Sequence, residues 1–310
     1  MTAPAPAAPV STATSGTTAG TDTRRRRPDA AYLWMLFPAL ALFTLFVTLP
    51  ALVGVFFSFT NYAGFGSWKW VGFENYRSLW HDSTILGSYQ FTLLFAVVTT
   101  IVVNALALAL AIGLSSKIHL KRGLRSVFFV PMVLSGIVIA YVFQYFFSFS
   151  VPAVAGSIGW TGGEQSLLAN QDWAWLGVVI VTAWQAIPSA MIIYLAGLLA
   201  IPGEVYEAAS LDGASAWRRF RSITLPLVAG YVVVNSILSF KNFLNAYDVI
   251  VGLTGGGPGT STTSVAMGIF NGFNNGDYAY SMANAVVFFV ITVVISLLQL
   301  RLLRGREVNL

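Results

Sequence analysis

Cysteine is absent from the 310 residues, so the sequence excludes disulfide bonds and metal sites built on thiolates. Histidine is nearly absent too: His81 and His119 are the only two, and neither has a second metal ligand at a recognisable spacing. We therefore expect no metal site. A membrane-embedded enzyme would need a nucleophile–base pair, a metal cluster or paired carboxylates, and the apolar runs contain none of these.

Charge is also scarce. Only 9% of the residues are charged, against about a quarter in a typical soluble domain, while 56% are hydrophobic. So little polar surface indicates that lipid is the solvent. The net charge of +5 does not indicate nucleic-acid binding, because no basic stripe alternates with stacking aromatic residues.

Six uncharged runs are long enough to cross a bilayer, which takes roughly 20 residues of helix. They cover residues 32–59, 85–116, 126–163, 173–203, 223–240 and 278–300, and the fifth continues past Lys241 to about Val251. The runs are continuously apolar and do not alternate as barrel strands would. The sequence therefore predicts an all-α polytopic membrane protein with six transmembrane helices.

Basic residues gather on one side of this six-helix arrangement. Fourteen of the seventeen lie in the N-terminal region, the second and fourth connectors and the C-terminal region, whereas the opposite side has Lys69 and Arg77. The positive-inside rule makes the first side cytoplasmic, with both termini. Abundant alanine and arginine beside scarce lysine are typical of proteins from GC-rich bacterial genomes, so we expect the membrane to be a bacterial cell membrane. Residues 1–30 read as a disordered cytoplasmic tail and 31–310 as the transmembrane domain.

The fourth connector concentrates charge between two apolar runs. Pro202 is suited to a helix start, Gly213 to the positive φ that ends a helix, and residues 214–220 to a second short helix. Trp217 and Phe220 would share one face of that second helix. The arginines here either hold the connector on the cytoplasmic side or mark a surface that another protein contacts.

The spacing within this connector favours the second interpretation. Glu207-Ala208-Ala209, then Gly213, then Ile223-Thr224-Leu225-Pro226 resembles the coupling signature of permeases in binding-protein-dependent ABC importers. The resemblance implies the type I permease fold and a coupling loop, residues 201–225, that docks on a separate ATPase. The residues that it assigns to coupling are Glu207, Ala208, Ala209, Asp212, Gly213, Trp217 and Arg218.

Three further segments are similar to those of carbohydrate-importer permeases of the first-subunit type. They are residues 71–76, with a Gly-Phe-x-Asn-Tyr element, residues 198–202 and residues 247–258. The Gly255-Gly256-Gly257 run is not a phosphate-binding loop, because no Gly-Lys-Ser/Thr follows it. The resemblance implies an importer subunit for an oligosaccharide or related sugar.

In that family the substrate passes between helices that correspond to the fourth and fifth runs. Ser239 matches a substrate-contacting serine of the maltose permease, whereas Phe243 and Ala246 stand where that permease has polar contacts. Lys241 and Asp248 are charges within or near a span, which are costly and usually functional. The candidate pathway residues are Thr182, Trp184, Gln185, Ser189, Ser239, Lys241, Asn242, Phe243, Asn245, Tyr247 and Asp248.

The resemblance also implies the partners: a second permease chain, two ATPase subunits that carry ATP and magnesium, and an extracellular solute-binding protein. This chain itself is expected to bind no cofactor and to catalyse no reaction. A permease for glycerol phosphate or another non-sugar solute is the alternative. An ion-coupled secondary transporter would lack the coupling signature and would need a buried acid, which the middle of the spans does not offer.

Overall fold

The structure is a computed structural model that describes residues 30–115 and 121–304. The predicted disordered tail, with Arg24 to Arg27, falls outside the described residues except for Ala30, which begins a helix. The chain divides into two units, residues 1–51 and residues 52–310. The described part of the first unit is helical throughout.

Helices form almost every element of the described chain. In order they are α1 (Ala30–Phe43), η1 (Thr44–Thr48), α2 (Leu49–Phe57), α3 (Glu74–Leu79), α4 (Ser83–Ser115), α5 (Lys121–Val133), α6 (Gly136–Tyr145), η2 (Phe146–Ser150), α7 (Val151–Ser157), η3 (Thr161–Gly163), η4 (Leu167–Ala169), α8 (Ala174–Leu199), α9 (Gly203–Leu211), α10 (Ala216–Arg219), η5 (Phe220–Thr224), α11 (Leu225–Leu227), α12 (Ala229–Leu244), α13 (Asp248–Leu253), α14 (Val265–Asn274) and α15 (Tyr278–Arg304).

Five helical segments of the described residues are long and apolar enough to span a membrane, or six if one bent pair counts as a single span. The first, second, fourth and sixth predicted runs correspond to Trp34–Phe57, Ser83–Ser115, Ala174–Leu199 and Tyr278–Arg301. The third run was expected to be one helix, but it is broken between Val133 and Gly136. The fifth run is bent by 67° between Ala216–Leu227 and Ala229–Leu244, and it is broken again after Leu244.

Three spans contain a wide π-helical turn, and a proline follows each turn at the same distance. Segments η1, η2 and η5 end at residues 48, 150 and 224, and Pro50, Pro152 and Pro226 stand two residues later. Proline has no N–H to donate and its ring clashes with the carbonyl four residues earlier. The wider turn relieves that clash while the helix continues.

The core of the second unit lies where α4 crosses α8. Small side chains on one face of α4, including Ala96, Ala107 and Ala111, are fully buried. In lipid the hydrophobic effect does not drive helices together, so their association relies on close van der Waals packing of small residues such as these. The Tyr194 hydroxyl of α8 donates to Asn104 Oδ1 of α4 at 2.6 Å, which adds a polar tie to the packing.

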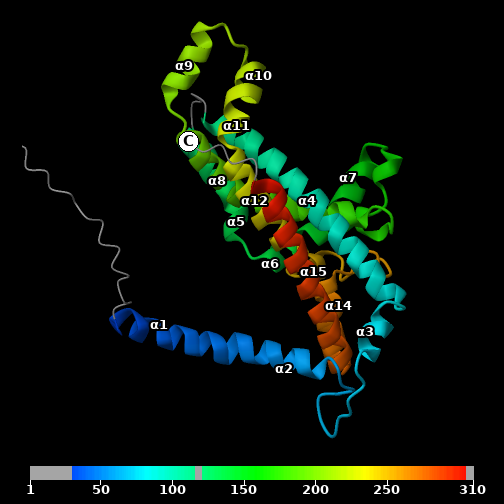
Figure 1. Cartoon of the computed structure of the whole chain (residues 1–310). Helices are drawn as coiled ribbons and strands as arrows, with labels where there is room; N and C mark the ends of the chain where they lie inside the picture. Colours follow the sequence, from blue (N-terminus) through cyan, green and yellow to red (C-terminus); the bar gives the residue numbers. More distant parts are fainter. Residues whose placement is uncertain (1–29, 116–120, 305–310) are drawn as a thin grey trace, which may run out of the picture. The chain divides into compact units, whose positions relative to one another are not determined.

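The Gly-Phe-x-Asn-Tyr element closes the loop between α2 and α3. Gly72 adopts φ +61°, and the Asn75 amide nitrogen donates to the carbonyls of Ser58 and Thr60, both at 2.8 Å. The Tyr76 hydroxyl lies 2.6 Å from Ser58 Oγ. This loop and α3 lie at the end of the bundle opposite α9 and α10, which project beyond the other helices (Figure 1).

Candidate functional site

Helix α9 ends in a hydrogen-bonded reverse turn. The Ala214 N–H donates to the Ala209 carbonyl at 2.9 Å, and the Gly213 N–H donates to the Ser210 carbonyl at 3.1 Å. Gly213 has φ +69°, a left-handed conformation that glycine adopts without steric cost. Together these features form a Schellman motif, which satisfies carbonyls at the helix end and reverses the chain. The turn predicted at Gly213 is present.

Two side-chain contacts join the half of the loop before the Gly213 turn to the half after it, which we call the descending half. Arg219 Nη1 donates to Ser210 Oγ at 2.8 Å, and the Tyr206 hydroxyl lies 3.0 Å from Thr224 Oγ1. Tyr206 and Ser210 belong to α9, whereas Arg219 and Thr224 follow the turn. The coupling loop is therefore a defined unit with internal contacts.

Most residues assigned to coupling face outward from this unit. The exposed ones are Glu207, Ala208, Asp212, Gly213, Trp217 and Arg218. Ala209 is buried, with 8% of its surface exposed. The sequence interpretation missed Leu211, which is 89% exposed beside the turn. A single exposed leucine is common on protein surfaces, but Leu211 shares this unit with Trp217, which is 67% exposed, and two large exposed apolar side chains in one short loop suit contact with a partner.

The second half of the loop differs from the prediction in length. The short helix expected over 214–220 begins at Ala216 and continues through η5 and α11 to Leu227. The fifth apolar run was predicted to begin at residue 223, but residues 223–227, with Pro226, belong to this longer helix, and α12 begins at Ala229 after the 67° bend. The π-turn before Pro226 allows the helix to continue through the proline. Trp217 and Phe220 share a face as predicted, with ring centroids 5.5 Å apart.

The breaks in the third and fifth spans lie close to the same residue of α8. Gln185 Nε2 donates to the Leu134 carbonyl, which the break in the third span leaves free, at 3.1 Å. A Cβ atom at Gly136 would lie 3.5 Å from Gln185 Oε1 and 3.6 Å from the Cβ of Asp248, the first residue of α13. Gln185 and Asp248 therefore flank the start of α6. Interrupted helices expose backbone polar groups, which membrane proteins tolerate where the backbone is buried in protein or lines a cavity.

The predicted pathway residues divide by exposure. Exposed residues are Trp184, Ser189, Lys241, Asn242, Asn245 and Asp248; partly buried ones are Gln185 and Tyr247; buried ones are Thr182, Ser239 and Phe243. Phe243 packs edge-on against Phe95 of α4, and Tyr247 packs edge-on against Phe270 of α14. In this conformation Ser239 and Phe243 thus face their own bundle.

One face of α12 and the start of α13 is exposed along its length. Val234, Leu238 and Lys241 of α12 and Asn245 directly after it follow at intervals of three or four residues, the spacing of one helix face, and Asp248, after the break, is also exposed. An adjacent face is fastened to α8: Asn235 Nδ2 donates to the Ala190 carbonyl at 2.9 Å. The exposed polar residues of this stripe are the ones that a solute or another chain can reach.

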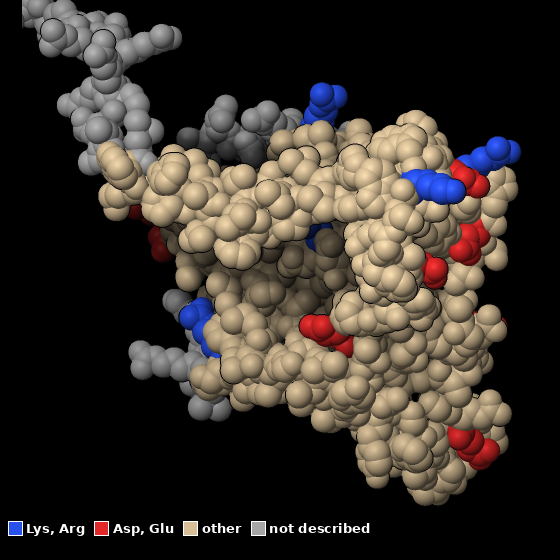
Figure 2. Space-filling model, turned by 90° about the horizontal axis from the view of Figure 1, so that it is seen from below, with Lys and Arg blue, Asp and Glu red and all other residues tan. Residues whose placement is uncertain are grey.

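Charged residues are sparse on the face of the molecule that Figure 2 shows, where uncharged residues cover most of the surface. Exposed large apolar side chains along the spans, such as Leu106 of α4 and Leu297 of α15, suit a lipid environment. Among the described residues, no group of three or more His, Cys, Asp or Glu side chains could hold a metal ion.

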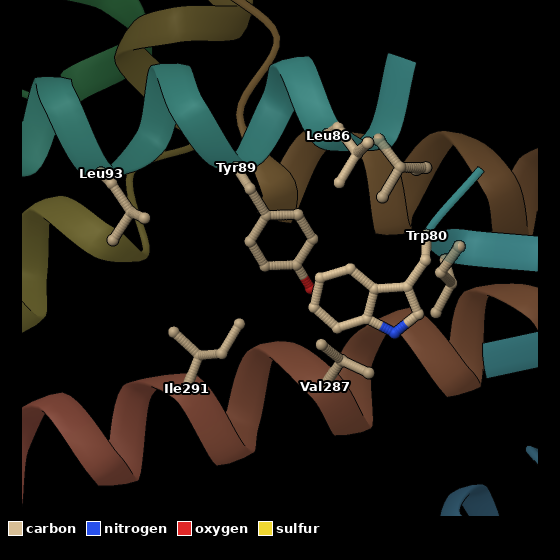
Figure 3. Close-up of a pocket in the computed structure, with 8 residues that line it drawn as sticks. Trp80, Leu86, Tyr89, Leu93, Val287 and Ile291 are labelled. Carbon is tan, nitrogen blue, oxygen red and sulfur yellow. The ribbon is translucent and has the colours of Figure 1, made fainter. Parts of the chain in front are cut away.

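A hollow between α4 and α15 is apolar and does not suit a sugar. Figure 3 shows Trp80, Leu86, Tyr89, Leu93, Val287 and Ile291 around it. The Tyr89 hydroxyl donates to Asn284 Oδ1 at 2.8 Å, so that hydroxyl is already satisfied by the protein. Recognition of sugar hydroxyls needs free hydrogen-bonding groups, which the exposed stripe of α12 offers and this hollow does not.

Comparison with known proteins agrees with these features. Residues 104–307 match the family model described as "Binding-protein-dependent transport system inner membrane component". The chain is 32% identical over 286 residues to AmyD of Thermoanaerobacterium thermosulfurigenes, a probable starch degradation products transport system permease, covering 91% of this chain and 97% of AmyD. It is 35% identical over 271 residues to MsmF of Streptococcus mutans, a multiple sugar-binding transport system permease, covering 87% and 93%.

A solved structure shares the fold. A chain of a bacterial ABC transporter that imports the acidic polysaccharide alginate superposes with a TM-score of 0.78 at 21% identity, covering 89% of this chain and 96% of that one. This likeness confirms the all-helical permease fold. The family match covers the coupling loop, the polar stripe of α12 and the last span, and the protein belongs to the inner-membrane permeases of binding-protein-dependent ABC importers.

Proposed function

We propose that this permease forms half of the translocation pathway of an ATP-driven importer for an oligosaccharide or related sugar. The observation that carries the proposal is the coupling loop. It combines a Schellman turn at Gly213 with an exposed Leu211 and flanking carboxylates. As an inner-membrane permease, the chain is a transport subunit, and ATP is hydrolysed by a separate protein.

The coupling residues contact the ATPase in this proposal. Leu211 fills an apolar recess of the ATPase, while Glu207 and Asp212 supply acceptors around it. Trp217, on the descending half, adds an exposed aromatic side chain with 67% of its surface accessible. Leucine and tryptophan side chains that lose solvent on docking provide binding energy, and the charges at the rim favour the correct partner.

Sugar transport is proposed from the relatives and from the chemistry of the exposed stripe. AmyD and MsmF are named for starch degradation products and multiple sugars, and a relative from Thermococcus litoralis is named for trehalose and maltose. Asn245 of the stripe, and Asn242, which is exposed beside the stripe, offer amide donors and acceptors for hydroxyl groups. Trp184 offers a partly exposed ring for the C–H face of a sugar.

The ABC importer to which this permease belongs contains a solute-binding protein and ATPases. We propose that it also contains a second permease chain, which completes the translocation pathway. Both termini are proposed to lie in the cytoplasm with the coupling loop. The C-terminal ends of α4 and α15 point toward the end of the bundle that carries α9 and α10 (Figure 1), which supports this orientation for the C-terminal side of the chain. Arg301, near the end of α15, is then cytoplasmic, in agreement with the positive-inside rule.

The test is ATP hydrolysis by the importer reconstituted in lipid nanodiscs from the genes that neighbour this one. Hydrolysis is measured with and without the solute-binding protein, across a panel of neutral and acidic oligosaccharides. Stimulation by one saccharide supports the proposal and identifies the solute. An assembled complex that no saccharide stimulates contradicts the carbohydrate assignment.

Transport of a small phosphate ester is the second candidate. UgpA of Agrobacterium fabrum, a glycerol-3-phosphate permease, is 30% identical over 275 residues. Lys241, an exposed cation within the fifth span, is the residue that favours this candidate. Stimulation of ATP hydrolysis by glycerol 3-phosphate, with none by saccharides, would establish it.

A further inference from the structure

A pocket of about 540 Å³ lies between the C-terminal end of α12, α14 and α15. Its polar lining consists of Lys241 and Asn245 at the end of α12, together with Thr292 and Ser296 of α15. Phe288 and Phe289 of α15 add aromatic side chains. The last span, which the sequence interpretation left out of the pathway, thus contributes half of the polar lining.

Three of the four polar residues hydrogen bond within their own helices. Thr292 Oγ1 donates to the Phe288 carbonyl at 2.8 Å, and Ser296 Oγ donates to the Thr292 carbonyl at 2.7 Å. Asn245 Nδ2 donates to the Lys241 carbonyl at 2.9 Å. These hydrogen bonds satisfy the three groups within their own helices and leave free lone pairs, or a second amide hydrogen, for a ligand.

Lys241 differs from these three residues, because no carboxylate among the described residues pairs with its ammonium group. No Asp or Glu is among the described residues that line the pocket. Asp248, the nearest acid along the chain, has its Cβ beside Gly136 of α6 rather than toward α15. A charged side chain within a span is costly unless it meets water or an opposite charge, so the pocket is built for one of these.

We infer that this pocket is a subsite of the translocation pathway that takes an anionic group of the transported solute, such as the carboxylate, sulfonate or phosphate of a sugar derivative. Lys241 supplies the opposite charge, Asn245 supplies a hydrogen bond, and the exposed Phe289 ring contacts the apolar face of the sugar. The inference rests on the proposed transport function and narrows its substrate class to acidic solutes.

The absence of cysteine from the chain permits a test that does not require the solute to be known. Thr292→Cys places a single thiol in the pocket of the reconstituted importer. Val294→Cys, two residues further along α15, is the matched control: Val294 is exposed but does not line the pocket. Both are treated with anionic sulfonatoethyl and cationic trimethylammonioethyl methanethiosulfonate, without nucleotide and after trapping with ATP and vanadate. Labelling of this chain is followed by mass spectrometry.

The readout is the ratio of the anionic to the cationic labelling rate, in which the reactivity of the thiol itself cancels. With Lys241 present, we expect Thr292→Cys to be labelled in at least one state, with a ratio about tenfold higher than in the double variant with Lys241→Gln. Lys241→Arg should restore the ratio. Val294→Cys should resist both reagents, because lipid excludes them.

Two results would overturn the inference. If Thr292→Cys is unreactive in both states, although the complex hydrolyses ATP, the pocket lies outside the aqueous pathway. If the ratio is unchanged by Lys241→Gln, an acid of the partner permease or another group neutralises Lys241. Neither result depends on which solute stimulates ATP hydrolysis, so failure of this inference can be told apart from failure of the proposed function.

Discussion

Replacement of Gly213 tests whether the shape of the coupling loop, and not only its composition, is required. Nothing lies within 4 Å of a Cβ built at Gly213, so Gly213→Ala introduces no clash. Its cost comes from the backbone, because φ +69° is unfavourable for a residue with a Cβ by roughly 1–2 kcal/mol. That free energy corresponds to about a 5- to 30-fold loss in the population of the native turn relative to other turn conformations.

If the loop adopts the native turn in only a fraction of the molecules, its apparent Kd for the partner equals the intrinsic Kd divided by that fraction. We therefore expect Gly213→Ala to raise the apparent Kd of the ATPase by up to the same factor, and Gly213→Asn to raise it less, since asparagine tolerates this conformation. The melting temperature of the permease should hardly change, because the loop lies outside the core.

The assay is titration of the purified ATPase onto the permease in nanodiscs, followed by ATP hydrolysis stimulated by the binding protein. Gly203→Ala is the control, because Gly203 also has open space around it but lacks a positive φ. Wild-type affinity and stimulation in Gly213→Ala would refute the reasoning. An equal loss in Gly203→Ala would show that the effect has another origin than the left-handed turn.

Three other substitutions probe separate parts of the molecule. Leu211→Asp should weaken ATPase binding at least about tenfold, because the side chain is 89% exposed and available to a partner; unchanged co-purification would remove it from the interface. Asn75→Leu removes two hydrogen bonds to loop carbonyls and should lower stability by about 2 kcal/mol, measured as faster proteolysis of the α2–α3 loop. Gly252→Val should separate α13 from α6, since a Cβ there would lie 2.7 Å from the Ala140 Cβ; an unchanged melting temperature would contradict that contact.

The number and positions of the spans were predictable because they depend on length and composition. An uninterrupted apolar run of about 20 residues has few alternatives to a transmembrane helix. Gly213 was equally predictable, since a helix ending in a reversal needs a left-handed residue and glycine supplies it. Both predictions rest on local properties of the chain.

The break in the third span could not be read from composition, because the residues around 134 are uncharged, as are those before and after them. The break after Leu244 lies in a polar stretch, residues 241–248, but the prediction continued the fifth span through it to about Val251. The break near 134 depends on Gln185, whose side chain bonds the freed carbonyl from 51 residues away. Only a tertiary contact makes that interruption tolerable, so a single sequence cannot place it.

The sequence also did not reveal which face of each span packs against neighbouring helices. A soluble helix separates apolar from polar faces, but a membrane helix packs against lipid as apolar as its own core. Ser239 and Phe243 share the face of α12 that packs inside the bundle, whereas Lys241 and Asn245 lie on the exposed face. The sequence placed all four in the pathway, and only the packing separates them.

The coupling loop is joined to the pathway through two helices that are fastened to each other. Three residues separate the end of α8 from the start of α9, and α12 follows the loop after the 67° bend. Asn235 of α12 donates to a carbonyl of α8, and a Cβ at Gly197 of α8 would lie 2.6 Å from the Tyr231 ring of α12. A displacement of the loop by the ATPase therefore acts on α8 and α12 together. Trp184 lies on α8, Lys241 lies on α12 and Asn245 directly follows α12, so these residues, which are proposed to contact the solute, move with the loop.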